Sequence, residues 1–66
     1  MVKKYRSIKS AYRDGFRIEK IKNYGDYVIA TARKNDDTLT LQERSTSLVK
    51  FFGQAKFRLM LIELED

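Results

Sequence analysis

The sequence predicts an α+β fold in which a three-stranded antiparallel β-meander packs against a carboxyl-terminal helix. Two runs rich in β-branched and aromatic residues flank a glycine-containing turn, and a second turn precedes a short alternating run. The last third of the chain repeats apolar residues at helical spacing. A small all-β barrel is the alternative fold, because parts of that last third also fit strands.

The basic segment 1–14 fits either a short helix or an extended arm. Tyr5, Ile8 and Tyr12 recur at spacings of three and four residues, and an Asp-Gly pair follows as a helix stop. Alternation of polar and apolar residues is poor over the same stretch, but it does not exclude an arm or an edge strand. We therefore expect a short basic helix or arm ahead of the sheet.

The three predicted strands span residues 16–22, 27–33 and 38–43. The first two form a β-hairpin around Asn23-Tyr24-Gly25-Asp26, a four-residue turn that contains glycine. Lys34-Asn35-Asp36-Asp37 supplies the second turn, because Asn and Asp tolerate left-handed backbone and hydrogen-bond to their own backbone. Consecutive antiparallel strands joined in this way give a meander.

The apolar register of the first strand shifts near Glu19. Ile18 and Ile21 are three residues apart, whereas side chains in a regular strand return to the same face every two residues. A β-bulge at this point would bring both isoleucines to one face. It would also place Arg17 and Lys20 together on the opposite face.

Residues 45–66 favour a single helix capped near Ser45 or Ser47. One stripe of this helix would carry Leu48, Phe52, Ala55, Leu59 and Ile62. Against it, Gly53 interrupts the interior at a cost of about 1 kcal/mol, and acidic residues at the carboxyl end oppose the helix dipole.

Two other interpretations of the carboxyl-terminal third stay open. One places strands at residues 48–52 and 57–64, with a turn between them. The other starts a helix at Thr40, uses the capping-box spacing to Glu43, stops at Gly53 and ends in a strand.

Composition excludes several classes of function. A chain of 66 residues forms at most one domain, 1–66, and can bury only about 60% of its unfolded surface, so a deep catalytic cleft is improbable. The chain has no cysteine and no histidine, which excludes the usual zinc and haem ligands and the commonest general base. It also lacks a glycine-rich phosphate loop and a nucleophile with a partner base. We expect no enzyme and no cofactor.

No stretch approaches the ~18 apolar residues of a membrane span, and the amino terminus lacks an apolar signal region. We therefore expect a cytoplasmic protein.

Positive charge is concentrated in the first third of the chain. Residues 1–22 hold eight basic and two acidic side chains, whereas the remaining residues hold six basic and seven acidic ones. Such a one-sided field attracts polyanions, so a non-catalytic nucleic-acid-binding protein, a small regulator or accessory factor for DNA or RNA, is the leading interpretation. The predicted contacts are Lys3, Lys4, Arg6, Lys9, Arg13, Arg17, Lys20, Lys22, Tyr24 and Arg33.

Within this set, the side chains differ in the contact they offer. Arg17 and Arg33 are the best candidates for bidentate contacts to guanine, and Tyr24, at a turn, is the ring best placed to stack on a base. A solvated face that keeps a small protein soluble is the simpler explanation of the same charges.

Other partners fit the same features. A basic face could dock on an acidic protein and modulate it, or lie on an anionic membrane surface. The apolar carboxyl-terminal third could also leave a surface that pairs with a second copy of the chain. The residues expected in such a homodimer are Phe51, Phe52, Phe57, Leu59, Met60, Leu61 and Ile62.

Overall fold

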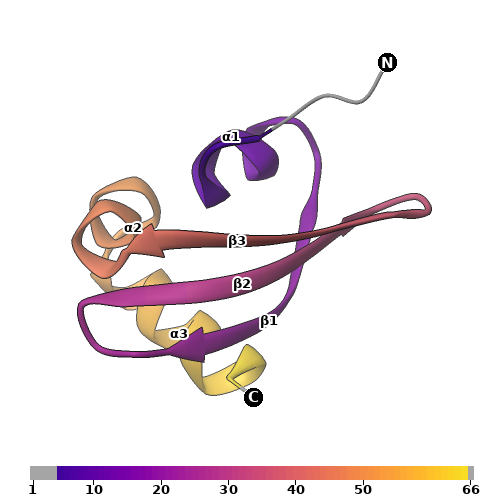
Figure 1. Cartoon of the computed structure of the whole chain (residues 1–66). Coiled ribbons are helices and arrows are strands. Elements are labelled where there is room, and N and C mark those ends of the chain that lie inside the picture. Colours follow the sequence, from indigo (N-terminus) through magenta and orange to yellow (C-terminus); the bar gives the residue numbers. More distant parts are fainter. Residues whose placement is uncertain (1–4, 66) are drawn as a thin grey trace.

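The computed structural model describes residues 5–65 and contains one three-stranded antiparallel sheet in the order β1-β2-β3 (Figure 1). The sheet is open rather than closed into a barrel, so the predicted meander is confirmed and the barrel alternative is wrong. In chain order the elements are α1 (Ile8–Arg13), β1 (Arg17–Asn23), β2 (Tyr27–Lys34), β3 (Asp37–Arg44), α2 (Ser45–Phe52) and α3 (Gln54–Leu64).

Within the basic amino-terminal segment, Ile8–Arg13 form the short helix α1. Ser7 caps α1 in a reciprocal capping box: its hydroxyl accepts from the Ser10 backbone N–H at 3.2 Å, and its own N–H donates to the Ser10 hydroxyl at 3.3 Å. These bonds satisfy two of the donors that a helix start leaves unpaired. Ile8 and Ala11, one turn apart, are buried against the sheet, which fixes the helix in place.

Strand β1 contains the predicted β-bulge. Ile18 pairs with Ala32 on β2, and Lys20 pairs with the preceding residue Thr31, so Glu19 is the extra residue. Ile18 and Ile21 are therefore both buried on the same face.

The second turn, between β2 and β3, depends on Asn35. Its φ is 55°, a left-handed conformation that asparagine adopts more readily than most residues. Lys34 and Asp37 pair on either side of this turn, and the register then continues without a shift to the end of β3.

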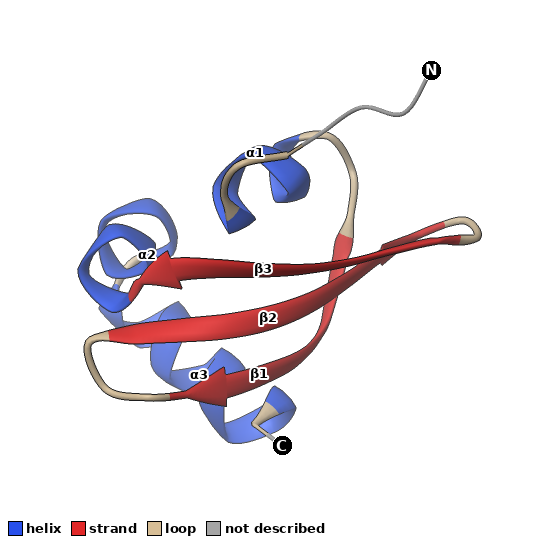
Figure 2. Cartoon of the chain, in the orientation of Figure 1, coloured by secondary structure: helices blue, strands red, loops and turns tan. Residues whose placement is uncertain are grey.

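The core lies on one face of the sheet, and all three helices pack there. Val28 and Ile21 meet Ile8 of α1, Leu48 of α2 and Phe57 of α3 in the main cluster. A smaller cluster joins α1 to the far end of the sheet through Ala11, Phe16 and Ala32. Figure 2 shows the three strands as one layer, with α3 behind them and α2 beside the end of β3. Within residues 5–65, no helix covers the sheet face that points away from the core.

The carboxyl-terminal third is helical, as favoured, but it forms two helices rather than one. Gly53 adopts φ 91° and ψ 151°, a conformation that is essentially restricted to glycine. Its N–H closes α2 by donating to the Val49 carbonyl at 2.8 Å, and its carbonyl opens α3 by accepting from Phe57 at 3.0 Å. The break lets α2 follow β3 while α3 turns back along β1. The two strand-containing alternatives for this segment are wrong.

Within residues 5–65, no helix is both long and apolar enough to cross a membrane.

Candidate nucleic-acid interface on the open face of the sheet

Alternate residues of the strands point away from the helices and form what we call the open face. Residues paired across an antiparallel sheet share a face, and the observed register links Arg17 with Arg33, Lys20 with Thr31 and Lys22 with Ile29. The open face consists of Arg17, Lys20, Lys22, Tyr27, Ile29, Thr31, Arg33, Thr38, Thr40, Gln42 and Arg44. The bulge at Glu19 brings Arg17 onto it together with the two lysines, as predicted from the sequence.

The open face is strongly basic. Five of its residues are lysine or arginine, none is acidic, and most of the others carry a hydroxyl or amide group. Glu19 reaches this face from the bulge, and its carboxylate lies 3.4 Å from the Arg33 guanidinium. Both side chains are well exposed, at 39% and 57%, so solvent screens the pair and its contribution to stability is small. The face therefore keeps a positive field.

Two arginines stand directly opposite each other on neighbouring strands. Arg17 on β1 pairs with Arg33 on β2, and like charges directly opposite each other destabilise a sheet. Neither guanidinium lies in the core. The pair places two exposed arginines, one of them beside Glu19, at neighbouring positions of the sheet, and planar guanidinium groups suit the recognition of phosphate or guanine.

A shallow depression runs across the middle of the open face. Its volume is about 290 Å³, and the residues that line it are Lys20, Ile21, Lys22, Ile29, Thr31 and Thr40. The half-buried Ile29 supplies an aliphatic surface, and the lysines and threonines supply donors around it. This combination can contact both an apolar base edge and a phosphate.

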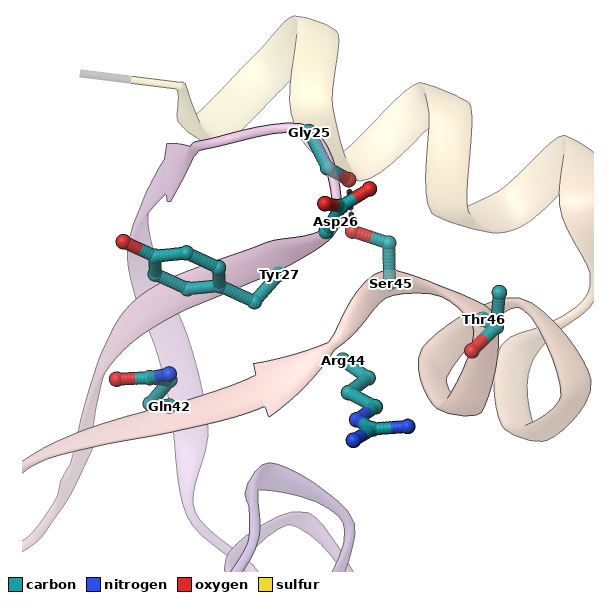
Figure 3. A pocket seen from close by; sticks show the side chains of 7 residues that line it. All are labelled: Gly25, Asp26, Tyr27, Gln42, Arg44, Ser45 and Thr46. Atoms are coloured by element: carbon teal, nitrogen blue, oxygen red, sulfur yellow. Dashed lines mark hydrogen bonds between the residues drawn. The ribbon is translucent and has the colours of Figure 1, made fainter.

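A larger hollow of about 510 Å³ lies at the end of the sheet where β3 leads into α2 (Figure 3). Two hydrogen bonds from Ser45, at the start of α2, hold the first turn beside this hollow. The Ser45 hydroxyl donates to the Gly25 carbonyl at 2.6 Å, and its N–H donates to the Asp26 carbonyl at 2.9 Å. The lining residues are Gly25, Asp26, Tyr27, Gln42, Arg44, Ser45 and Thr46. Arg44 therefore extends the positive charge of the open face to this end.

Sequence reasoning missed Arg44, because it concentrated on the basic first third of the chain and the first hairpin. The alternation of Thr40, Gln42 and Arg44 along the third strand carried the necessary information, because residues two apart share a face. Extending the predicted third strand by one residue would have placed Arg44 with them.

The rings of Tyr24 and Tyr27 stack on each other beside the first turn. Their centroids are 5.0 Å apart and their planes differ by 11°. Tyr24 is half exposed, as the sequence suggested for a turn residue, while Tyr27 belongs to the open face. One face of each ring is thus already occupied by the other.

Lys9 and Arg13, the cations of α1, are separate from the open face, because α1 packs on the opposite side of the sheet. Lys9 pairs at 3.5 Å with Glu43, whose side chain is only 8% exposed, and the Arg13 guanidinium lies 5.1 Å from the centre of the Phe51 ring. Arg6 is exposed. Of the predicted nucleic-acid contacts, the structure brings four together on the open face, with Tyr24 at one end of it: Arg17, Lys20, Lys22 and Arg33. Lys3 and Lys4 lie outside the described residues.

Comparison with known proteins adds no family to this description: no family model, no curated protein and no solved structure matches the chain. Within residues 5–65, no group of three or more acidic, histidine or cysteine side chains is placed to hold a metal ion.

Proposed function

We propose that this chain is a non-catalytic nucleic-acid-binding protein and that the open face is its binding surface. The observation that carries the proposal is the gathering of five cations, with hydroxyl and amide groups between them and Glu19 as the one acidic side chain that reaches them, on the sheet face that no helix covers within the described residues. A small domain has little surface that is not needed for burial or solubility. A flat, donor-rich surface of one charge is what a phosphate backbone binds.

Duplex nucleic acid fits the dimensions of the open face. Neighbouring strands lie about 4.8 Å apart, so three strands span roughly 10 Å between the outer two, against a major groove of about 12 Å in B-form DNA. In this arrangement Arg17, Lys20 and Lys22 on the β1 edge face one phosphate backbone, and Arg44 on the β3 edge faces the other. The central strand then meets the base edges.

The side chains of the central strand also favour a duplex over a single strand. Proteins that bind single strands stack successive bases on exposed aromatic rings. The open face has one ring, that of Tyr27, and Tyr24 already covers one side of it. Ile29 and Thr31 instead offer short apolar and hydroxyl contacts to base edges. We therefore name duplex DNA as the target, because the major groove of double-stranded RNA is too narrow for side chains to read.

The test is fluorescence anisotropy with labelled duplex DNA, single-stranded DNA and double-stranded RNA at about 50 and 200 mM salt. The open-face variant R17Q/K20Q/K22Q is compared with K50Q/K56Q/R58Q, which removes the same residue types from exposed positions on α2 and α3. If three phosphate contacts are lost, the open-face variant should lower the slope of log affinity against log salt by about 2.7. The control should stay close to the parent.

Other outcomes separate the alternatives. Equal losses in both variants would show that net charge alone drives binding and would overturn the assignment to the open face. A preference for single strands would keep the nucleic-acid function but reject groove insertion. Absence of binding to all three probes at low salt would overturn the nucleic-acid proposal and turn the search to an acidic protein partner, whose apolar contacts would resist salt.

A further inference from the structure

Helix α3 is apolar on two opposite sides. Phe57 is buried, and Met60, Leu61 and Leu64 pack beside it against the core. On the far side, Ala55, Leu59 and Ile62 follow one another at spacings of four and three residues, which places them on one stripe. We call this stripe the outer ridge. Leu59 is 53% exposed and Ile62 is 80% exposed, so the ridge has no cover within the described chain.

The structure narrows the homodimer surface expected from the sequence. Phe57 belongs to the core, and the Phe51 and Phe52 rings pack edge-on against Tyr12 of α1, with centroids at 6.0 and 4.9 Å. Of the expected residues, only Leu59 and Ile62 stay exposed. Any pairing through this third of the chain therefore centres on the outer ridge.

On one flank of the outer ridge, opposite charges are spaced for an antiparallel pair, whereas the exposed Arg58 lies on the other flank. Lys56 and Glu63 lie on the same flank of α3 and are seven residues apart, as are Ala55 and Ile62 on the ridge. When α3 packs against an antiparallel α3, Ala55 faces Ile62 of the second copy. Lys56, whose Nζ donates to the Tyr12 hydroxyl at 3.4 Å and lies over the Tyr12 and Phe52 rings, remains exposed and comes within reach of Glu63 of the second copy. Both contacts occur twice by symmetry. The small Ala55 leaves room for the larger Ile62, and the two helix dipoles oppose each other.

We propose that the outer ridge binds a second copy of this chain, forming a two-fold dimer through antiparallel α3 helices. Leu59 of each copy lies near the two-fold axis. The interface is one short helix per copy and so falls below the ~800 Å² per partner of a standard interface, which predicts a weak dimer that dissociates on dilution. This proposal is independent of the function of the open face, which lies on the other side of the sheet.

The first test is sedimentation equilibrium from about 5 to about 500 μM protein, because a dimer responds to concentration by mass action. The parent should change from monomer to dimer over this range. L59E/I62E should stay monomeric throughout, whereas T38E/T40E, which adds the same charge to the open face, should dimerise like the parent. A parent that stays monomeric at the highest concentration, or an L59E/I62E variant that dimerises normally, would overturn the proposal.

The second test fixes the orientation by disulfide trapping, which is clean because the chain has no cysteine of its own. L59C should cross-link to itself under mild oxidation. A55C alone should not, because Ala55 faces Ile62 of the second copy, so at 1.5 Å per residue the two copies of residue 55 lie about 10 Å apart along the antiparallel helices, beyond the ~7 Å that a disulfide spans. A mixture of A55C and I62C should form the cross-linked heterodimer. Efficient self-linking of A55C would indicate parallel helices and reject the proposed arrangement.

Discussion

The two faces of the sheet are built from alternate residues of the same strands, yet they differ in almost every physical property. On the covered face, Val28 and Ile21 are at most 1% exposed and meet apolar side chains from all three helices. On the open face, their neighbours are long cations and hydroxyl residues, including two arginines directly opposite each other. The comparison indicates that one face provides stability while the other is free to carry a charge pattern that costs stability. Substitutions should therefore affect one face at a time.

The largest expected effect comes from the covered face. Leu48→Ala should lower the free energy of unfolding by about 2–5 kcal/mol, because a fully buried leucine leaves a cavity in a core this small. Thr40→Ala on the open face should change it by no more than about 0.5 kcal/mol. Urea unfolding followed by circular dichroism measures both. Similar losses in the two variants would contradict the division of roles between the faces.

A somewhat smaller loss is expected at the junction of the two covering helices. Gly53→Ala should destabilise the fold by about 1–3 kcal/mol, because its backbone conformation is essentially closed to residues with a Cβ. No atom lies within 4 Å of the position that the Cβ would take, so the cost is conformational rather than steric crowding by neighbours. Comparing the melting temperature of this variant with that of Gln54→Ala, one residue further on, isolates the conformational cost at position 53. An unchanged or higher melting temperature would mean that an unbroken helix packs equally well.

A change on the open face should move stability and binding in opposite directions. Glu19→Gln removes the acidic partner of Arg33, which lies opposite Arg17. Affinity for duplex DNA should rise about two- to fivefold, equivalent to ~0.5–1 kcal/mol, while stability falls slightly. Anisotropy and urea unfolding on the same sample test this. Glu65→Gln, with the same charge change at the end of α3, should not raise affinity; an equal rise would assign the effect to net charge.

The smallest expected effect is a pH dependence on the covered side. The hydrogen bond that Tyr5 donates to the Asp14 carboxylate, aided by desolvation and by the charge of Asp14, raises the pKa of the Tyr5 hydroxyl from 10.0 to about 12. The unfolded chain thus loses this proton first as pH rises. The stabilisation of the folded chain by this hydrogen bond is complete below pH 10 and is lost between about pH 10 and 12. A plot of melting temperature against pH should therefore be flatter for Tyr5→Phe than for the parent over this window.

Much of the fold could be predicted because local patterns and tertiary packing agree. The glycine-containing turn, the Asn-Asp turn and the spacing of Ile18 and Ile21 predict the meander and its bulge, and each is found in the structure. The same spacing predicts that Arg17 and Lys20 share a face, so this part of the candidate site could also be predicted from the sequence.

The remainder depends on information that is not local. The apolar stripe of residues 45–66 continues across Gly53, so periodicity alone favours one helix, and only the positions of β3 and β1 explain why two are needed. The side of the sheet on which α1 packs is likewise set by Ile8 and Ala11 in the assembled core, which separates its cations from those of the strands. Charge density along the chain cannot show this separation.

The bulge at Glu19 has a consequence for how the gene can change. Because Glu19 is the extra residue, loss of its single codon would leave Ile18, Lys20, Ile21 and Lys22 alternating in regular register, with each side chain on its present face. The regular pairing of β2 with β3 has no such extra residue, so loss of a codon within β2, such as that for Thr31, would exchange the two surfaces of part of that strand. Of the two strands, β1 is therefore the one in which a change of length can be inherited without loss of the fold.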